Sequence, residues 1–299
     1  MSKILVTGAG GMVGHSVQQC FNFHELVLTD IVPNYRHLDV AQKNEVEQIL
    51  QETNPDTILH LAAATDVDRC ETDQTYAYKS NVVGTQNLVI AARQQNLTFI
   101  FLSTSAIFNG IQMTPYIEND TAQPVNYYAK TKLEGEHFIQ EHLKNYFIIR
   151  AGWMIGGGKI RDKKFVGKII EKIQLGEKEI FAVNDKYGSP TYAKDLVHTI
   201  ERLIQTKYYG VYHAANGFGC TRYDIANEIK NVLGKKEVSV HPVSSDAFPL
   251  PAPRGKSEQI QNKALKERGV DFMRPWQIAL RDYILNDYLN PSNKNKNNL

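Results

Sequence analysis

Short apolar runs alternate with longer polar segments through the first half of the chain. The apolar runs are rich in β-branched residues, which is typical of strands that are buried on both faces. Predicted strands cover residues 3–7, 25–29, 57–62, 98–102 and 146–151, and predicted helices cover residues 12–21, 42–53, 79–95 and 128–143. This alternation predicts an α/β fold, in which helices cover both faces of a doubly wound parallel sheet.

The pattern loosens after about residue 152, so a different kind of structure is expected in the second half. We predict, in chain order, a helix within Lys159–Lys172, strands over 180–183 and 211–214, a helix over 222–233 with Thr221 as N-cap, an extended proline-rich loop over 242–253, and a disordered tail over 290–299. The strand at 211–214 is expected to return to the main sheet.

A glycine-rich segment joins the first predicted strand to the first predicted helix. Gly8 permits a sharp turn, Gly11 lets backbone approach a pyrophosphate, and Gly14 lets the helix pack closely on the strand. The free N–H groups at the helix start, at Met12 and Val13, would then bind phosphate oxygens. Because this loop follows a strand and opens a helix, it predicts a dinucleotide site in a Rossmann-type fold.

The second predicted strand ends at an acidic residue, Asp30, which lies 19 residues beyond Gly11. A carboxylate at this position would accept hydrogen bonds from the adenosine ribose and repel a 2′-phosphate. This favours NAD(H) over NADP(H), although Arg36 is near enough in sequence to leave NADP(H) open. A solvated acid at a strand end is the alternative interpretation.

Tyr128 and Lys132 stand four residues apart in a predicted helix, so they share one face. A phenol is a weak acid at neutral pH, and a nearby cation favours its ionised form. The pair therefore has the chemistry of a general acid that protonates a carbonyl oxygen. Two hydroxyl residues, Thr104 and Ser105, follow the fourth predicted strand and would lie above the same edge of the sheet. Tyr-x-x-x-Lys also arises by chance in many helices, so the glycine loop is needed to support this interpretation.

Composition excludes several classes of protein. The 299 residues are 42% hydrophobic and 22% charged with a formal net charge of +2, which gives no argument for nucleic acid or an anionic membrane. No apolar stretch is long enough to span a bilayer, and the chain begins almost at once with a strand rather than a secretory signal. Three scattered cysteines and nine histidines without ligand spacing predict a reduced cytoplasmic protein without a metal site.

Three motifs in residues 1 to about 155 resemble the extended short-chain dehydrogenase/reductase family. They are the glycine loop from Thr7 to Gly14, the segment His60–Ala64 after the third strand, and the segment Asn81–Leu88 on a helix. The resemblance implies a dinucleotide-binding Rossmann domain over residues 1–155, with its sheet completed by parts of 178–215. Residues 156–289 would then form mainly a smaller α+β substrate lobe, before a tail over 290–299.

A narrower resemblance is to the sugar-nucleotide 4-keto reductases, in particular the dTDP-4-dehydrorhamnose reductase group. The similar segments are residues 147–153, 183–191, 249–254 and 262–265. This chain departs from the pattern in two places. Ser105 stands where many relatives carry aspartate, and the loop Gly156–Lys164 looks longer than usual, which bears on the identity of the sugar and base more than on the chemistry.

By this resemblance, NAD(P)H reduces C4 of a nucleotide-linked 4-keto-6-deoxy hexose in deoxysugar or polysaccharide precursor biosynthesis. Tyr128 would donate the proton, Lys132 would depress the phenol pKa and hold the nicotinamide ribose, and Thr104 or, less favoured, Ser105 would bind the carbonyl oxygen. The predicted cofactor-binding residues are Gly8, Gly11, Met12, Val13, Gly14, Asp30, Asp39, Val40, Ala62, Ala63, Ala64, Asn81, Ser103, Tyr128 and Lys132. The predicted substrate-binding residues are Thr104, Ser105, Trp153, Asn184, Tyr187 and Arg254.

Several of these residues have ordinary structural alternatives. Trp153 would stack on a sugar or base, or belong to the core. Arg150 would bind a diphosphate or form a structural ion pair, and Arg254 in the proline-rich loop is the better diphosphate candidate. Asn184 and Tyr187 would line the substrate site or form a turn. A basic cluster would steer an anionic substrate or form a solvated helix face; it consists of Lys159, Arg161, Lys163, Lys164 and Lys168.

Two other functions stay open at this stage. A nucleotide-sugar epimerase or dehydratase would retain NAD and turn over without added reductant. A non-catalytic regulatory subunit on the same fold, resembling that of methionine adenosyltransferase, would bind a dinucleotide without needing the Thr104, Tyr128 and Lys132 set. Relatives are often homodimers, but no self-complementary apolar stripe supports that assembly in the sequence.

Overall fold

The computed structural model describes residues 1–290 and confirms the predicted parallel sheet. Seven strands pair in the order β11-β6-β5-β4-β1-β2-β3, and every pairing among them is parallel. Their bounds are β1 Lys3–Thr7, β2 Glu25–Asp30, β3 Arg36–His37, β4 Thr57–His60, β5 Thr98–Thr104, β6 Tyr146–Ala151 and β11 Gly210–Ala214. The strand order reverses at β1 and β4, which is where ligands bind on such sheets.

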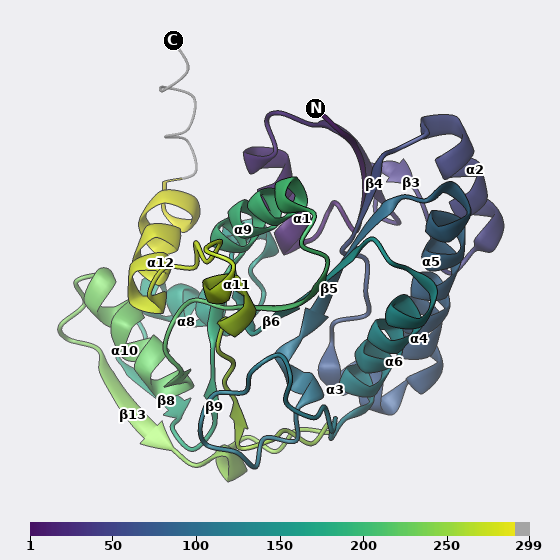
Figure 1. Cartoon of the computed structure of the whole chain (residues 1–299). Helices are drawn as coiled ribbons and strands as arrows, with labels where there is room; N and C mark the ends of the chain where they lie inside the picture. The colour runs from purple at the N-terminus through teal and green to yellow at the C-terminus, as the bar shows by residue number, and fades with distance from the viewer. Residues whose placement is uncertain (291–299) are drawn as a thin grey trace.

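Helices cover both faces of this sheet, as Figure 1 shows. In β1, Ile4 and Val6 join the apolar core on one face, and Leu5 joins the core on the other, because successive side chains point to opposite faces. The first core includes α1 Met12–Cys20, α9 Ala193–Thr206 and α11 Lys263–Glu267, and the second includes α2 Lys43–Thr53, α5 Gly84–Gln95 and α6 Tyr127–His142.

A separate apolar core forms beyond the end of β6, and we call the structure around it the second lobe. In Figure 1 its helices α8, α10 and α12 lie together on the side away from α2 and α5. Its elements are β7 Trp153–Ile155, α7 Gly158–Arg161, α8 Phe165–Gln174, β8 Glu179–Val183, β9 Tyr187–Gly188, β10 Pro190–Tyr192, β12 Cys220–Thr221, α10 Arg222–Val232, β13 Ser239–Val243, β14 Ser257–Glu258, α12 Trp276–Asp282 and the π-helix η4 Tyr283–Tyr288. The predicted N-cap holds, because the Thr221 side chain accepts from the Asp224 N–H in a capping box.

The structure differs from the predicted elements where polar side chains bind backbone N–H groups and override the apolar pattern. Asp73 caps a helix start at α4 Gln74–Tyr78, so the helix predicted from 79 begins earlier and passes through a π-helix, η1 Lys79–Val83, before α5. The predicted 159–172 helix is split into α7 and α8 at residues 162–164, where the Asp162 side chain accepts from the Lys164 N–H. Elements beyond those predicted include the 14-residue helix α9, together with β3, α3 Val67–Thr72 with Asp66 as N-cap, and two 3₁₀ turns, η2 Ser105–Ile107 and η3 Ser245–Ala247.

Two other predictions have mixed outcomes. The strand at 210–214 returns to the main sheet as expected, whereas 179–183 pairs instead with β13. The proline-rich segment predicted as an extended loop contributes the end of β13 and η3. The tail predicted from Asn290 falls, from 291 onward, outside the described residues.

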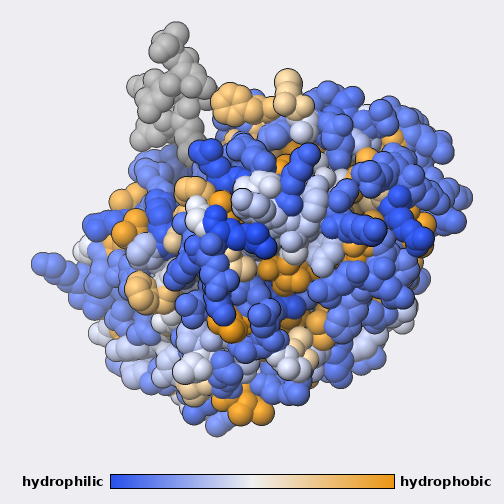
Figure 2. All heavy atoms as spheres, in the orientation of Figure 1, coloured by the Kyte–Doolittle hydropathy of each residue, from blue (hydrophilic) through white to orange (hydrophobic). Residues whose placement is uncertain are grey.

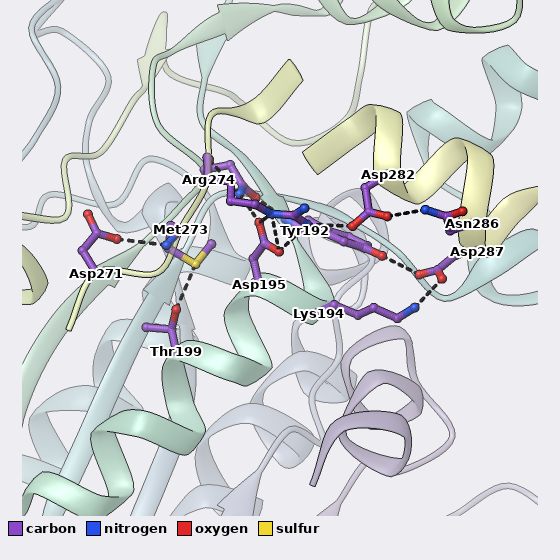
Figure 3. A network of polar contacts seen from close by, with 11 residues as sticks. Tyr192, Lys194, Asp195, Thr199, Asp271, Met273, Arg274, Asp282, Asn286 and Asp287 are labelled. Atoms are coloured by element: carbon purple, nitrogen blue, oxygen red, sulfur yellow. Dashed lines mark hydrogen bonds and ion pairs between the residues drawn. The ribbon is translucent and has the colours of Figure 1, made fainter. Parts of the chain in front are cut away.

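A network of charged side chains fastens the C-terminal helices to α9 (Figure 3). Arg274 donates to both carboxylate oxygens of Asp195 at 2.6–3.1 Å and to Asp282 at 2.9 Å. Lys194 and the Tyr192 hydroxyl both bind Asp287. These contacts join a helix that packs on the main sheet to the helices of the second lobe, so they fix the two parts to each other.

The outer surface is largely polar on the side drawn in Figure 2, where hydrophobic residues form smaller, separated areas among hydrophilic ones. Within residues 1–290, no helix combines the length and apolar character that a membrane span requires.

Candidate active site

The glycine loop between β1 and α1 makes two close backbone contacts that a side chain would prevent. Gly8 has φ +70°, and a Cβ there would lie 2.6 Å from the Ala62 nitrogen. A Cβ on Gly14 would lie 2.6 Å from the Ala9 Cα. Gly11 begins α1 without a side-chain cap, and the first turn holds no acidic residue. The N-terminus of α1 therefore presents backbone N–H groups, including those near Met12 and Val13, to an anion.

Asp30 lies beside this loop, as its position at the end of β2 predicts. Its carboxylate accepts from the N–H groups of Gly10 at 2.9 Å, Ile31 at 2.7 Å and Val32 at 3.2 Å. Arg36 pairs with Glu52 instead of facing the loop. The carboxylate is thus oriented by the backbone, and the one basic side chain that weakened the NAD(H) prediction is engaged elsewhere.

Two further residues that were predicted to bind the cofactor follow β3. Asp39 accepts from the Ala41 N–H at 3.0 Å and its own N–H donates to Glu45, so its side chain shapes the turn before α2. Val40 is buried, and its Cγ2 would lie 2.5 Å from a Cβ on Gly84. Val40 therefore packs the turn against α5.

Asn81 holds the segment after β4 in place. Its amide oxygen accepts from the Ala64 N–H at 2.7 Å, and its nitrogen donates to the Ala64 carbonyl at 3.1 Å and to the Thr131 hydroxyl at 3.0 Å. Asn81 lies in the π-helix η1, a deviation that is frequent at functional sites. The side chain joins the predicted cofactor wall, Ala62–Ala64, to helix α6, so Asn81 is a positioning residue for both.

Thr104 and Tyr128 are brought together at the carboxyl end of β5. Thr104 is the last residue of β5, and Asn126 caps α6 by accepting from the Ala129 N–H at 2.9 Å, which places Tyr128 in the first helical turn. Burial raises the pKa of Tyr128 to about 12, and a hydrogen bond with the Thr104 side chain opposes that rise. The phenol is therefore protonated throughout the neutral range. Ser105 is also buried at this end of β5.

Lys132 is buried one turn along α6, with its Nζ 3.8 Å from the centre of the Phe101 ring. Burial lowers the pKa of Lys132 to about 7, against an opposing attraction from Glu136. The depression of the Tyr128 pKa by Lys132 stays a prediction, because the net change in that pKa is a rise. The reason is that both groups are withdrawn from water, which disfavours phenolate and ammonium alike.

Arg150 and Ser103 belong to a buried network rather than to an open site. Arg150 donates to both oxygens of Glu136 at 2.7–3.1 Å, and Ser103 donates to the same carboxylate. Arg150 was expected either to bind a diphosphate or to form a structural ion pair, and the structure shows the ion pair. The Ser103 hydroxyl, predicted to bind the cofactor, is directed to Glu136 instead.

Trp153 is covered by neighbours of its own chain. The Arg222 guanidinium lies 3.9 Å from the ring centre, a Cβ on Gly188 would lie 2.2 Å from the ring, and the indole N–H donates to Glu258 at 3.2 Å. Stacking on a sugar would require some of these contacts to change. Arg222 was missed in the sequence, because a lone arginine after Thr221 carries no local signal of the Trp153 contact.

Arg254 forms a two-pronged ion pair with Asp68 of α3, at 2.8 and 2.9 Å. The segment around it also reaches α6, because Asn126 donates to the Pro253 carbonyl at 3.1 Å. Arg254, the predicted diphosphate-binding residue, is therefore paired with a carboxylate. The segment that carries it joins the second lobe to the start of the helix that holds Tyr128. Tyr187 is half-buried nearby on β9, and Asn184 is exposed.

The basic cluster divides in the structure. Lys159, Lys163, Lys164 and Lys168 are exposed, as a solvated face would be. Arg161 instead reaches the glycine loop, where its Nε donates to the Gly10 carbonyl at 3.1 Å. The sequence placed it only within a charged run, because the contact spans 151 residues.

Comparison with known proteins identifies the family to which the chain is similar. The model of a family described as the RmlD substrate binding domain matches residues 2–289. The spore coat polysaccharide biosynthesis protein SpsK of Bacillus subtilis (strain 168) is 31% identical over 95% of this chain and 97% of its own. A dTDP-4-dehydrorhamnose reductase of Mycolicibacterium smegmatis is 32% identical over 94% of this chain and 85% of its own.

A solved structure gives the same result. The dTDP-4-dehydrorhamnose reductase of Bacillus anthracis str. Ames, in complex with NADP, is 32% identical and superimposes with a TM-score of 0.89. The match covers 95% of this chain and 98% of that one.

Proposed function

Because this chain belongs to the RmlD substrate binding domain family, we propose that it uses NAD(P)H to reduce the C4 keto group of a dTDP-linked 4-keto-6-deoxy hexose. The observation that carries this proposal is the position of Thr104 beside a buried, protonated Tyr128 at the carboxyl end of β5. It occurs in a chain that matches keto-sugar reductases over more than nine-tenths of its length. The name of SpsK supports a place in polysaccharide precursor synthesis.

The residues around the glycine loop fit a dinucleotide. A Cβ at Gly8 or Gly14 would fill the space that the loop needs, the start of α1 is uncapped, and Asp30 faces the loop. When bound, NAD(P)H would supply the hydride. Backbone N–H groups from Gly11 to Gly14 would hold its phosphates, Asp30 its adenosine ribose, and Ala62–Ala64 would form a wall beside it.

The protein's own part in the reaction is to hold the keto oxygen and protonate it. Thr104 would donate a hydrogen bond to that oxygen, where negative charge grows as the carbonyl is reduced. Tyr128, protonated at neutral pH, would transfer its proton to the same oxygen. Lys132 would stabilise the phenolate left behind, since its ammonium favours the charged form of a neighbouring phenol.

Coenzyme oxidation with defined sugars tests the proposal directly. The protein is incubated with dTDP-4-keto-6-deoxy sugars and either NADH or NADPH, and coenzyme fluorescence is followed. We expect stoichiometric loss of reduced coenzyme with formation of a 4-hydroxy sugar. An epimerase or dehydratase would turn over without consuming coenzyme. A regulatory subunit would show no turnover and would instead co-purify with a stoichiometric enzyme partner.

Asp30 leads us to expect a preference for NADH. A 2′-phosphate beside this carboxylate would suffer like-charge repulsion, and Arg36 is paired with Glu52. We expect kcat/KM for NADH to exceed that for NADPH by roughly tenfold or more, a difference of about 1.4 kcal/mol. The Asp30→Ser variant should lose most of this preference. Equal use of both coenzymes by the wild-type protein would contradict the assignment of Asp30.

The assembly and location of the protein are also proposed. We expect a cytoplasmic homodimer, on the basis of the resemblance to dimeric relatives and of the scattered cysteines. Size-exclusion chromatography with light scattering would measure the mass directly, and a mass near the 33.9 kDa of one chain would contradict the dimer.

A further inference from the structure

We propose that Arg161 of the second lobe binds the diphosphate of the dinucleotide cofactor, together with the N-terminus of α1. The inference rests on the proposed use of a dinucleotide and adds a ligand that comes from outside the glycine loop. It concerns binding alone, so it is tested without turnover.

The first support is a direct contact with the glycine loop. The Arg161 Nε donates to the Gly10 carbonyl at 3.1 Å, and the Gly10 N–H donates to Asp30 at 2.9 Å. The peptide groups on either side of Gly10 are thereby held from two directions. Gly10 directly precedes Gly11, the N-cap of α1. The guanidinium therefore lies at the N-terminal end of that helix, where phosphate binds.

The second support is the way the loop before Arg161 packs on α1. Gly156, Gly157 and Gly158 have φ values of +145°, +80° and +64°, which L side chains rarely adopt. A Cβ on Gly156 or Gly157 would lie 3.3–3.4 Å from the Met12 side chain. The loop thus lies against the first turn of α1, and its three glycines make that approach feasible.

The loop is also anchored firmly on its other side. The Tyr283 hydroxyl donates to Asp162 at 2.9 Å and lies 3.3 Å from the Gly156 carbonyl. Asp162, in turn, accepts from the Lys164 N–H at 3.2 Å. Arg161 is therefore carried by a segment fixed at both ends, so its guanidinium is positioned before any ligand arrives, which lowers the entropy cost of binding.

The third support is that Arg161 has donors to spare. A guanidinium carries five N–H donors, and the Gly10 contact uses one. Among residues 1–290, no other hydrogen bond or ion pair of its side chain is found, and its nitrogens are not enclosed away from water. The first turn of α1 contributes no acidic residue that would neutralise the charge. The remaining N–H groups match the paired oxygens of a phosphate.

Binding of ADP-ribose and adenosine separates the diphosphate contact from the rest of the site. ADP-ribose contains the diphosphate but no nicotinamide, and adenosine contains no phosphate. For Arg161→Met we expect the Kd of ADP-ribose, measured by calorimetry, to rise by about 10- to 100-fold, the range of a charge-assisted hydrogen bond. Adenosine binding, followed by NMR titration, should stay within twofold. Arg161→Lys keeps the charge without the planar fork and should fall between the two.

A control on the same short helix distinguishes the contact from general attraction. Lys159 is exposed on α7, so Lys159→Met removes the same charge from the same segment and should leave ADP-ribose binding within twofold. Unchanged ADP-ribose binding in Arg161→Met would overturn the inference. So would an equal loss of adenosine binding, which would mean that Arg161 only shapes the loop, or a wild-type protein that binds no ADP-ribose.

These outcomes are independent of the proposed reaction. A protein that binds ADP-ribose through Arg161 but reduces no dTDP-linked keto sugar would refute the reductase proposal and leave this inference standing. A protein that reduces such a sugar, but whose ADP-ribose binding does not depend on Arg161, would support the reductase proposal and refute this inference.

Discussion

Replacing Tyr128 with phenylalanine should lower kcat by about 10²- to 10⁴-fold, the usual contribution of a positioned proton donor. The substitution removes one oxygen from a residue whose hydroxyl lies beside Thr104 and whose ring packs against a buried apolar cluster. The ring stays in place, so the fold and the Kd of the coenzyme should be retained. The measurement is kcat with a dTDP-linked keto sugar, alongside coenzyme binding by fluorescence.

The neighbouring tyrosine supplies a matched control. Tyr127 packs against the same apolar cluster as Tyr128, and its backbone N–H, which the substitution leaves intact, donates to Glu71. Tyr127→Phe should therefore keep kcat within about twofold. An unchanged turnover number in Tyr128→Phe would refute the assignment, and an equal loss in both variants would point to damage at the start of α6 rather than to a missing proton donor.

The raised pKa of Tyr128 suits a donor better than a base. With a pKa of about 12, the phenol holds its proton at any pH at which the protein is assayed. Reduction of a ketone needs a proton at the oxygen, so the protonated phenol is in the state that this direction requires. Burial opposes the effect of a nearby cation on a phenol, and it accounts for the direction of the shift.

Local signals predicted much of the fold and the outline of the site. The strand over residues 146–151 has the predicted bounds, and the strand at 3–7, the turn at Gly8 and the helix from Met12 follow from apolar runs and glycine spacing alone. The apolar pattern misplaced the start of a helix where a polar side chain binds the backbone. Asp73 begins a helix five residues before the apolar period at 79 suggests, because its side chain binds the Tyr76 N–H.

Contacts between distant segments were beyond reach of the sequence. Arg254 looked like a diphosphate ligand because it lies in a proline-rich loop, and its ion-pair partner Asp68 is 186 residues away in the sequence. The ion pair of Arg150 could not be assigned from the sequence for the same reason. Its partner Glu136 lies on α6 and faces Arg150 only after that helix packs on the sheet. A single charged residue in a sequence indicates a charge to be satisfied, and the fold determines whether a ligand or another side chain satisfies it.

Lys132 should make the protein less stable at acidic than at alkaline pH. Its pKa is 10.5 when exposed and about 7 in the folded protein, where burial outweighs the attraction of Glu136. Between these values the unfolded chain binds more protons than the folded one, so the free energy of unfolding rises with pH. Below pH 7 the cost of burying the ammonium is fully present, and it is on the order of 5 kcal/mol.

The Lys132→Met variant isolates this contribution. Methionine fills a similar volume without a charge, so we expect the variant to exceed the wild type in free energy of unfolding by on the order of 5 kcal/mol at pH 6. The difference should shrink steadily above pH 7 and nearly vanish by pH 10.5. Urea unfolding of both proteins at pH 6, 8 and 10 measures it. Lys130→Met, an exposed position on the same helix, should differ from the wild type by less than about 0.5 kcal/mol at every pH.

The same variant should be both more stable and less active, and that combination identifies why the lysine is buried. A core position that contributes only packing would favour methionine at every pH, with no loss of turnover. A buried ammonium that is retained at a cost in stability is typical of a group held for chemistry. A stability difference that does not change with pH would mean that Lys132 stays charged through its position 3.8 Å from the Phe101 ring, and its proposed role beside Tyr128 would then rest on a permanent cation instead of a titrating one.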